Sequence, residues 1–125
     1  MTYLRCTIGR WNIELHSDEG REAFRLIEDE GLRVFREQPG FIRYRLMVAD
    51  PTTTIAVAEW ENEELGTLGA QRYREWLGSS GIAEMLSLET YDGEVMIASW
   101  TCELRRIGFW RLSAHCSRRN ERTLV

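Results

Sequence analysis

The chain has 125 residues, of which 43% are hydrophobic and 29% charged, and its formal net charge is −4. This length fits one domain, and the composition is that of a globular protein rather than of a disordered chain. No apolar run approaches the roughly 20 residues of a membrane span, and the first residues lack the basic and apolar regions of a secretion signal, so we expect a cytoplasmic protein with no membrane partner.

Charge is unevenly divided along the chain. All 16 basic residues are arginines. Residues 1–100 hold ten arginines against eighteen acidic residues, whereas residues 101–125 hold six against two. Because nucleic-acid binding needs a basic face that neutralises phosphates, the acidic body argues against a nucleic-acid partner. We expect one domain at 1–100 and a basic C-terminal tail or arm at 101–125.

Cysteine and histidine are too few and too widely spaced to indicate a metal site. The three cysteines are Cys6, Cys102 and Cys116, and the two histidines are His16 and His115. They form neither a CxxC pair nor a mixed cluster, so we predict no metal ligands and no disulfide framework.

The first strand is predicted at residues 3–15, where β-forming residues are frequent. A helix follows to about Glu37, and either Ser17 or Asp18 can cap its first turn. Pro39-Gly40 ends this helix. Its apolar face is predicted from four residues at helical spacing, Phe24, Ile27, Val34 and Phe35.

Two strands joined by a short turn are predicted at 41–49 and 54–61, and the short link makes them an antiparallel pair. In the second of these strands, Ala56, Ala58 and Trp60 share one side. In the first strand, alternation separates Ile42, Tyr44, Leu46 and Val48 from Phe41, Arg43, Arg45 and Met47.

A second helix is predicted at 63–77, and we expect Gly66 and Gly69 to weaken it. After a break at 78–81 and a short helical turn at 82–86, two strand-like segments follow at 86–91 and 94–100. They are separated by Asp92-Gly93, which is a strong hairpin signal.

The order β-α-β-β-α-β predicts an α+β fold of the ferredoxin-like type, with both helices on one face of an antiparallel sheet. The other face of the sheet carries apolar residues that no further element covers. Because a second copy of the chain would cover them, we expect a homodimer formed by the sheet faces.

Three short segments are typical of a known family. Pro39-Gly40-Phe41 closes the first helix and opens a strand, the strand at 54–60 ends in Trp60, and the acidic and amide residues 61–64 begin the next helix. Over roughly residues 3–100 the chain therefore resembles the antibiotic-biosynthesis-monooxygenase family. The resemblance implies that two ferredoxin-like domains form a dimeric α/β barrel.

The resemblance also implies a chemistry, that of a cofactor-independent monooxygenase acting on a hydroxylated aromatic or polyketide-like small molecule. A phenol or hydroquinone bound between sheet and helices loses a proton, and its anion reacts directly with O₂ without flavin or metal. A polyketide cyclase or isomerase, and a non-catalytic small-molecule-binding or stress-associated dimer, occur on the same fold. The stretch from Trp60 to Ser87 lacks the histidine that binds haem iron in haem-degrading relatives.

Three catalytic candidates follow from this reading. Trp60 matches the family motif and would be a ring wall with an indole N–H donor, although core packing explains it equally well. Asn12 would donate to a ligand oxygen, as strand-one asparagines do in the family. Tyr44 would exchange a proton with a phenolic oxygen. No general base is identified.

Four further residues are candidates for substrate binding. Arg43 and Arg45 share a strand face and would hold an anionic substrate, or pair with acids across the dimer. Tyr73 would exchange a proton in the manner of Tyr44, and Trp76 lies on the same predicted helix. We expect Arg74, on that helix, to be part of a solvated face.

Overall fold

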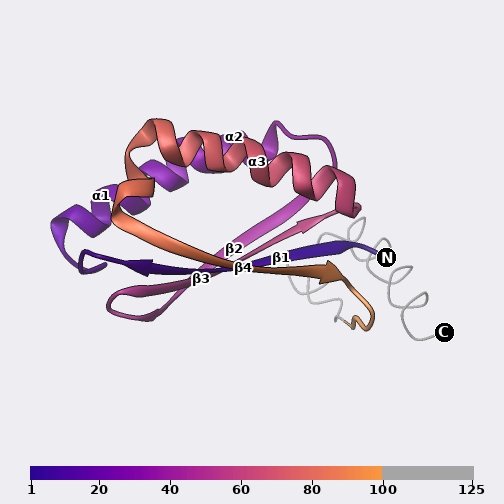
Figure 1. Cartoon of the computed structure of the whole chain (residues 1–125), viewed down its shortest axis with the longest axis horizontal. Helices are drawn as coiled ribbons and strands as arrows, with labels where there is room; N and C mark the ends of the chain where they lie inside the picture. The colour runs from indigo at the N-terminus through magenta and orange to yellow at the C-terminus, as the bar shows by residue number, and fades with distance from the viewer. Residues whose placement is uncertain (100–125) are drawn as a thin grey trace, which may run out of the picture. The chain divides into compact units, whose positions relative to one another are not determined.

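The computed structural model describes residues 1–99, and residues Met1–Val95 form one compact unit. The basic tail expected at 101–125 lies outside the described residues. The elements follow one another along the chain as in Figure 1: β1 (Tyr3–Trp11), α1 (Asp18–Leu26), a π-helical turn (Ile27–Gly31), α2 (Leu32–Arg36), β2 (Phe41–Asp50), β3 (Thr53–Trp60), α3 (Glu63–Ser80), a 3₁₀ turn (Ile82–Met85) and β4 (Leu86–Glu94).

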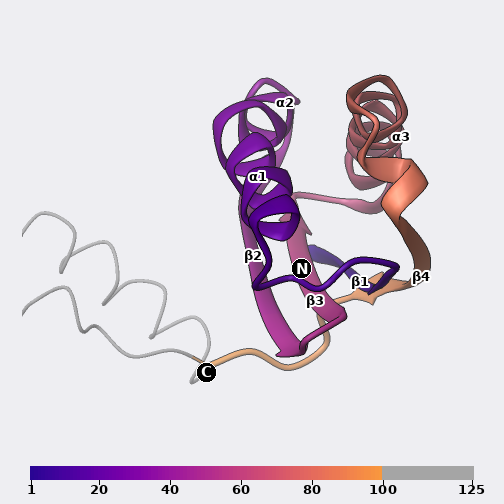
Figure 2. The same ribbon diagram turned by 90° about the vertical axis from the view of Figure 1, so that its left-hand side faces the viewer.

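The four strands form one antiparallel sheet in the order β2-β3-β1-β4. All helices lie on the same face of this sheet, with α1 and α2 above β2 and with α3 above β1 and β4 (Figure 2). This arrangement confirms the predicted ferredoxin-like α+β fold. Among residues 1–99, no helix lies on the opposite face of the sheet.

Both helix starts are fixed by side-chain caps. The Ser17 hydroxyl accepts a hydrogen bond from the Gly20 amide at 3.2 Å, and the Asn62 carboxamide accepts one from the Leu65 amide at 2.9 Å. Such caps satisfy amide groups that have no partner within the helix. At its other end, α3 continues three residues beyond the predicted end at Leu77. It stops at Gly81, whose φ of 86° is typical of the residue that follows a helix.

The first strand is shorter than predicted, because β1 ends at Trp11 and not at residue 15. The chain there leaves the sheet for the helix layer. Backbone bonds hold this crossing, with the Asn12 amide donating to the Met85 carbonyl at 2.7 Å and the Leu15 amide to the Pro51 carbonyl at 2.8 Å. Leu15 is thereby placed in the core with 1% of its surface exposed.

The hairpin predicted at Asp92-Gly93 is wrong. Both residues lie inside β4, where Asp92 pairs with Arg5 and Gly93 with Leu4. A guanidinium nitrogen of Arg5 lies 2.7 Å from a carboxylate oxygen of Asp92. The continuous pairing of β4 along β1 therefore outweighs the local turn preference of the dipeptide.

The predicted alternation of β2 fails at its first residue. A bulge separates Phe41 from Arg43, so Phe41 and Tyr44 both face the helices. Phe35 stacks on both of them, with ring centroids 5.4 Å from Phe41 and 4.7 Å from Tyr44. In β3, by contrast, Ala56, Ala58 and Trp60 share the inner face as predicted.

The predicted first helix forms with one irregularity. A π-helical turn at Ile27–Gly31 separates α1 from α2, and the Leu32 amide donates to the Ile27 carbonyl. The predicted apolar face is confirmed, since Ile27 and Phe35 are buried and Phe24 and Val34 half-buried. The π turn also brings Gly31 against the indole of Trp76.

Candidate functional site

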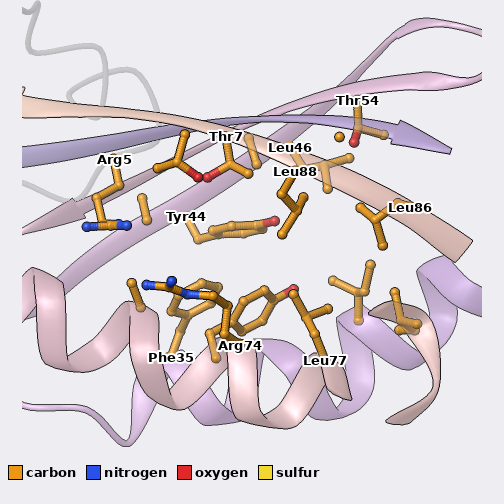
Figure 3. A pocket seen from close by; sticks show the side chains of 18 of the residues that line it. Arg5, Thr7, Phe35, Tyr44, Leu46, Thr54, Arg74, Leu77, Leu86 and Leu88 are labelled. Atoms are coloured by element: carbon orange, nitrogen blue, oxygen red, sulfur yellow. The ribbon is translucent and has the colours of Figure 1, made fainter. Parts of the chain in front are cut away.

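A cavity lies between the helices and the inner face of the sheet (Figure 3). Its empty space, the open mouth included, is about 750 Å³. Residues from every strand and from both helical segments line it. Most of the lining is apolar, which is typical of small-molecule sites.

Small residues on the inner face of the sheet leave the space that forms the cavity. Ala56 and Ala58 of β3 line it with less than a tenth of their surface exposed. Gly9 of β1 lines it as well, and a Cβ there would lie 2.7 Å from the hydroxyl oxygen of Thr54. That hydroxyl accepts a hydrogen bond from the Trp11 indole at 2.9 Å, so the position has no room for a side chain.

Aromatic rings form one wall of the cavity. The Phe35 ring stacks on Tyr73 with centroids 4.1 Å apart and an interplanar angle of 15°. Its stacking on Tyr44 joins the wall to β2, and its contact with Trp60, at 5.9 Å, joins the wall to β3. The structure therefore brings three predicted site residues, Trp60, Tyr44 and Tyr73, into one cluster.

Trp60 is fully buried, yet its indole nitrogen has no hydrogen-bond partner among the described residues. The ring lies against α3, where a Cβ at Gly66 would sit 3.2 Å from it and a Cβ at Gly69 would overlap it. Most buried polar groups in proteins are paired, so this unpaired indole N–H is an exception, and the residue that carries it also lines the cavity.

Both cavity phenols are protonated at neutral pH, and burial raises their pKa values further. It raises the pKa of Tyr44 to about 12, although a hydrogen bond from Tyr73 partly opposes this shift. Burial also raises the pKa of Tyr73 above its ordinary value, and the neighbouring Tyr44 raises it further. Each phenol therefore remains a hydrogen-bond donor under physiological conditions.

Polar groups gather at one end of the cavity. Arg5 of β1 and Arg74 of α3 both line it, and Figure 3 shows their guanidinium groups at the same end. Arg5 is mostly buried, with 14% of its side chain exposed, whereas Arg74 is exposed at the mouth. Arg74 was expected in a solvated face, and its second role, as part of the cavity lining, was missed.

Four predicted site residues lie outside the cavity lining, and Asn12 and Trp76 are two of them. Asn12 is exposed after the end of β1, and its side-chain amide donates to the Glu84 carbonyl at 3.2 Å. Trp76 is half-buried behind Tyr73, with ring centroids 5.4 Å apart, and packs over Gly31. Trp76 therefore supports the aromatic wall without lining the cavity itself.

Arg43 and Arg45 lie on the opposite face of the sheet from the cavity. Arg43 pairs with Glu59 of β3, the nitrogen–oxygen distance being 2.9 Å, and the Thr2 hydroxyl donates to the same carboxylate. Within one chain these arginines cannot reach a ligand in the cavity.

Among residues 1–99, no three His, Cys, Asp or Glu side chains are grouped so as to hold a metal ion. No helix in this part of the chain is both long and apolar enough to cross a membrane.

Comparison with protein families matches residues 13–86 to the family Antibiotic biosynthesis monooxygenase. The chain belongs to this family. Among solved structures, it is similar to SnoaB, a cofactor-independent oxygenase from Streptomyces nogalater, with 11% identity over 78% of this chain and 95% of that chain and a TM-score of 0.62. No curated protein sequence matches the chain.

Two further structures share the fold. A protein of unknown function from Nitrosomonas europaea is 14% identical, with 81% of this chain and 96% of that chain covered and a TM-score of 0.59. HapK from Hahella chejuensis is 12% identical, with 81% and 98% covered and a TM-score of 0.57. At these identities the likeness concerns the fold alone.

The motif that indicated the antibiotic biosynthesis monooxygenase family has a physical basis in this member. Gly40 adopts a φ of 78°, and its carbonyl accepts a hydrogen bond from the Glu61 amide at 2.8 Å. This turn places Phe41 edge-on to Trp60, with ring centroids 5.4 Å apart. The Pro-Gly-Phe segment and the strand-end tryptophan therefore meet beside the cavity.

Proposed function

We propose that this family member is a cofactor-independent monooxygenase of a planar hydroxylated aromatic, which binds and reacts in the cavity between sheet and helices. The observation that carries the proposal is the composition of that cavity. Its walls are aromatic and aliphatic, and its few polar groups include the two protonated phenols of Tyr44 and Tyr73. This combination suits a flat ring bearing oxygen substituents.

The first role of these residues is to bind and orient the substrate. The stacked rings of Phe35, Tyr44 and Tyr73 provide a surface for an aromatic ligand, since offset and edge contacts between rings are favourable. The hydroxyls of Tyr44 and Tyr73 are neighbours, and either can rotate to donate to a ligand oxygen. A phenolic oxygen of the substrate is the natural acceptor.

The second role is to stabilise negative charge on that oxygen. When the substrate phenol loses its proton, donors that already point at the oxygen stabilise the anion without reorganising. A tyrosine with a pKa of about 12 serves this purpose as a donor and not as a base. Tyr73 lies beside Tyr44 in the same aromatic wall and is a second phenol donor for that oxygen.

The reaction is balanced by substrate and O₂ alone. A phenol with a free para position gains one oxygen atom there and becomes a quinone. The second oxygen atom leaves as water, which carries the two hydrogens that the substrate loses. The four electrons that reduce O₂ come from the ring itself, so the stoichiometry needs no external reductant.

Oxygen consumption with a panel of phenols tests the proposal. In buffer containing a metal chelator, ¹⁸O₂ should place one labelled atom in the quinone and one in water. Tyr44→Phe should lower kcat by roughly tenfold or more, because one donor to the oxyanion is lost. Tyr91→Phe is the matched control, since Tyr91 is exposed on the other face of the sheet.

Two results would contradict the proposal. One is turnover that the chelator abolishes, or that starts only when a flavin is added. The other is saturable binding of the aromatic without oxygen consumption by any member of the panel, which would support a binding protein or a cyclase instead.

A further inference from the structure

The cavity has two chemically different ends (Figure 3). At one end the guanidinium groups of Arg5 and Arg74 approach from the sheet and from α3. At the other end Leu77 and Leu86 close the space with aliphatic carbon. A ligand lying along the cavity therefore meets hydrocarbon with one end and positive charge with the other.

The positive charge at this end is only partly neutralised. Arg5 forms a salt bridge with Asp92, with a nitrogen–oxygen distance of 2.7 Å. Burial and the neighbouring Asp92 carboxylate raise the pKa of Tyr3, so a protonated phenol also lies beside this carboxylate. Among residues 1–99, no carboxylate lies within salt-bridge distance of Arg74. By contrast, a guanidinium nitrogen of Arg72, on the same helix, lies 3.9 Å from a carboxylate oxygen of Glu75. Within the described part of the chain, the mouth thus carries one unmatched positive charge, that of Arg74.

We propose that the substrate carries a carboxylate, which Arg74 binds at the mouth while the aromatic ring lies in the cavity. The proposal rests on the proposed function in one respect, namely that an aromatic occupies this site. One unmatched guanidinium fits a singly charged anion, and the planar fork of arginine fits the two oxygens of a carboxylate. Arg5, which is already paired with Asp92, contributes positive electrostatic potential and one further hydrogen-bond donor.

The carboxylate also fixes the direction of binding. With the acid group at the arginine end, the ring extends past Thr7 and Thr90, which face each other across β1 and β4 and both line the cavity. The ring then reaches the region of Tyr44, where the donor to a phenolic oxygen lies. Recognition of the acid and activation of the phenol are therefore made by different residues.

Binding of a matched pair of ligands tests this proposal. The probes are 1-hydroxy-2-naphthoic acid and its carboxamide, which have similar shape but differ in charge, and calorimetric titration gives the two dissociation constants. The full-length protein should bind the acid about tenfold more tightly than the amide. Raising the ionic strength should reduce this preference, because exposed charge pairs are screened by salt.

Three variants test whether the preference for the acid arises from Arg74 at the mouth of the cavity. Arg74→Gln should remove the preference for the acid and leave the affinity for the amide within about twofold. Arg72→Gln is the matched control, because this exposed arginine lies on the same helix but does not line the cavity, and it should keep the preference. Asp92→Asn should strengthen binding of the acid, since it removes the negative charge beside Arg5.

Three outcomes would overturn the inference. Equal binding of acid and amide by the unmodified protein, or an equal loss of both in Arg74→Gln, would show that the mouth does not select an anion, while aromatic binding in the cavity would stand. Failure of both probes to bind would contradict the proposed function together with this inference.

Discussion

Trp60 and the glycines above it illustrate how single residues shape the site. From sequence, Gly66 and Gly69 indicate only a weakened helix. In the structure, the indole of Trp60 occupies the space that side chains at these positions would fill. The glycines thus allow α3 to lie close to the end of β3. The helix propensity that they lose is offset by burial of the largest side chain of the core.

A pair of alanine substitutions in α3 measures this packing. Gly69→Ala places a methyl group within the Trp60 ring and should lower the free energy of unfolding by roughly 2 kcal/mol or more. Gly78→Ala, in the same helix but with nothing within 4 Å, should be neutral or stabilising by up to about 1 kcal/mol. Urea denaturation of both variants checks this. Equal stabilities would show that the indole does not pack against Gly69.

The composition of the cavity was predictable only in part. Two alanines beside a tryptophan on one strand face indicate space that a ligand or a neighbour must fill, and the structure places the cavity above them. Arg5 could not be found in this way, because an arginine on a strand is usually solvated. Arg5 lies an even number of residues from the buried Tyr3 and Trp11 along β1, so its side chain points to the same face of the sheet. The sequence does contain this signal.

At the level of elements, the sequence predicts the order of the helices and strands correctly but not the residues at which they begin and end. Helix and strand patterns arise from local periodicity, which the chain shows clearly. The bulge after Phe41 and the uninterrupted course of β4 depend on pairing with neighbouring strands. Such non-local pairing outweighs the turn preference of Asp92-Gly93 and the strict alternation expected around Ile42.

Substitution of Gly93 tests the corrected course of β4. Gly93 has open space around its Cβ position and no positive φ, so Gly93→Thr should stabilise the protein by up to about 1 kcal/mol through strand propensity and a less flexible unfolded chain. Gly40→Thr is the contrasting variant and should destabilise, because Gly40 has a φ of 78° and lies against Leu65. Thermal unfolding of both gives the answer. Strong destabilisation by Gly93→Thr would instead indicate the hairpin.

At the scale of the whole molecule, the face of the sheet opposite the helices is the main unexplained surface. On it, Ile8 pairs with Ile55 and Cys6 with Val57, so apolar side chains form a stripe across β1 and β3. Met47 extends the stripe with 56% of its surface exposed. We propose that a second copy of the chain covers this stripe, as a contiguous apolar patch favours association.

Sedimentation tests this assembly. The protein should sediment at about twice its chain mass of 14.6 kDa, since closed two-fold assemblies are the commonest. Ile55→Glu should shift it to the monomer, because it puts a charge at the centre of the buried stripe. Leu68→Glu, on an exposed part of α3, should leave the mass unchanged. A folded monomer in the unmodified protein would refute the dimer.

The central claim is that the cavity between helices and sheet is the binding site, and a cavity-filling substitution tests it most directly. Ala56→Leu places three carbons in the floor of the cavity, so calorimetric titration with 1-naphthol should show at least roughly tenfold weaker binding, while the melting temperature stays the same or rises. Ala83→Leu, an exposed position outside the cavity, should bind like the unmodified protein. Undiminished binding of 1-naphthol by Ala56→Leu would contradict the account.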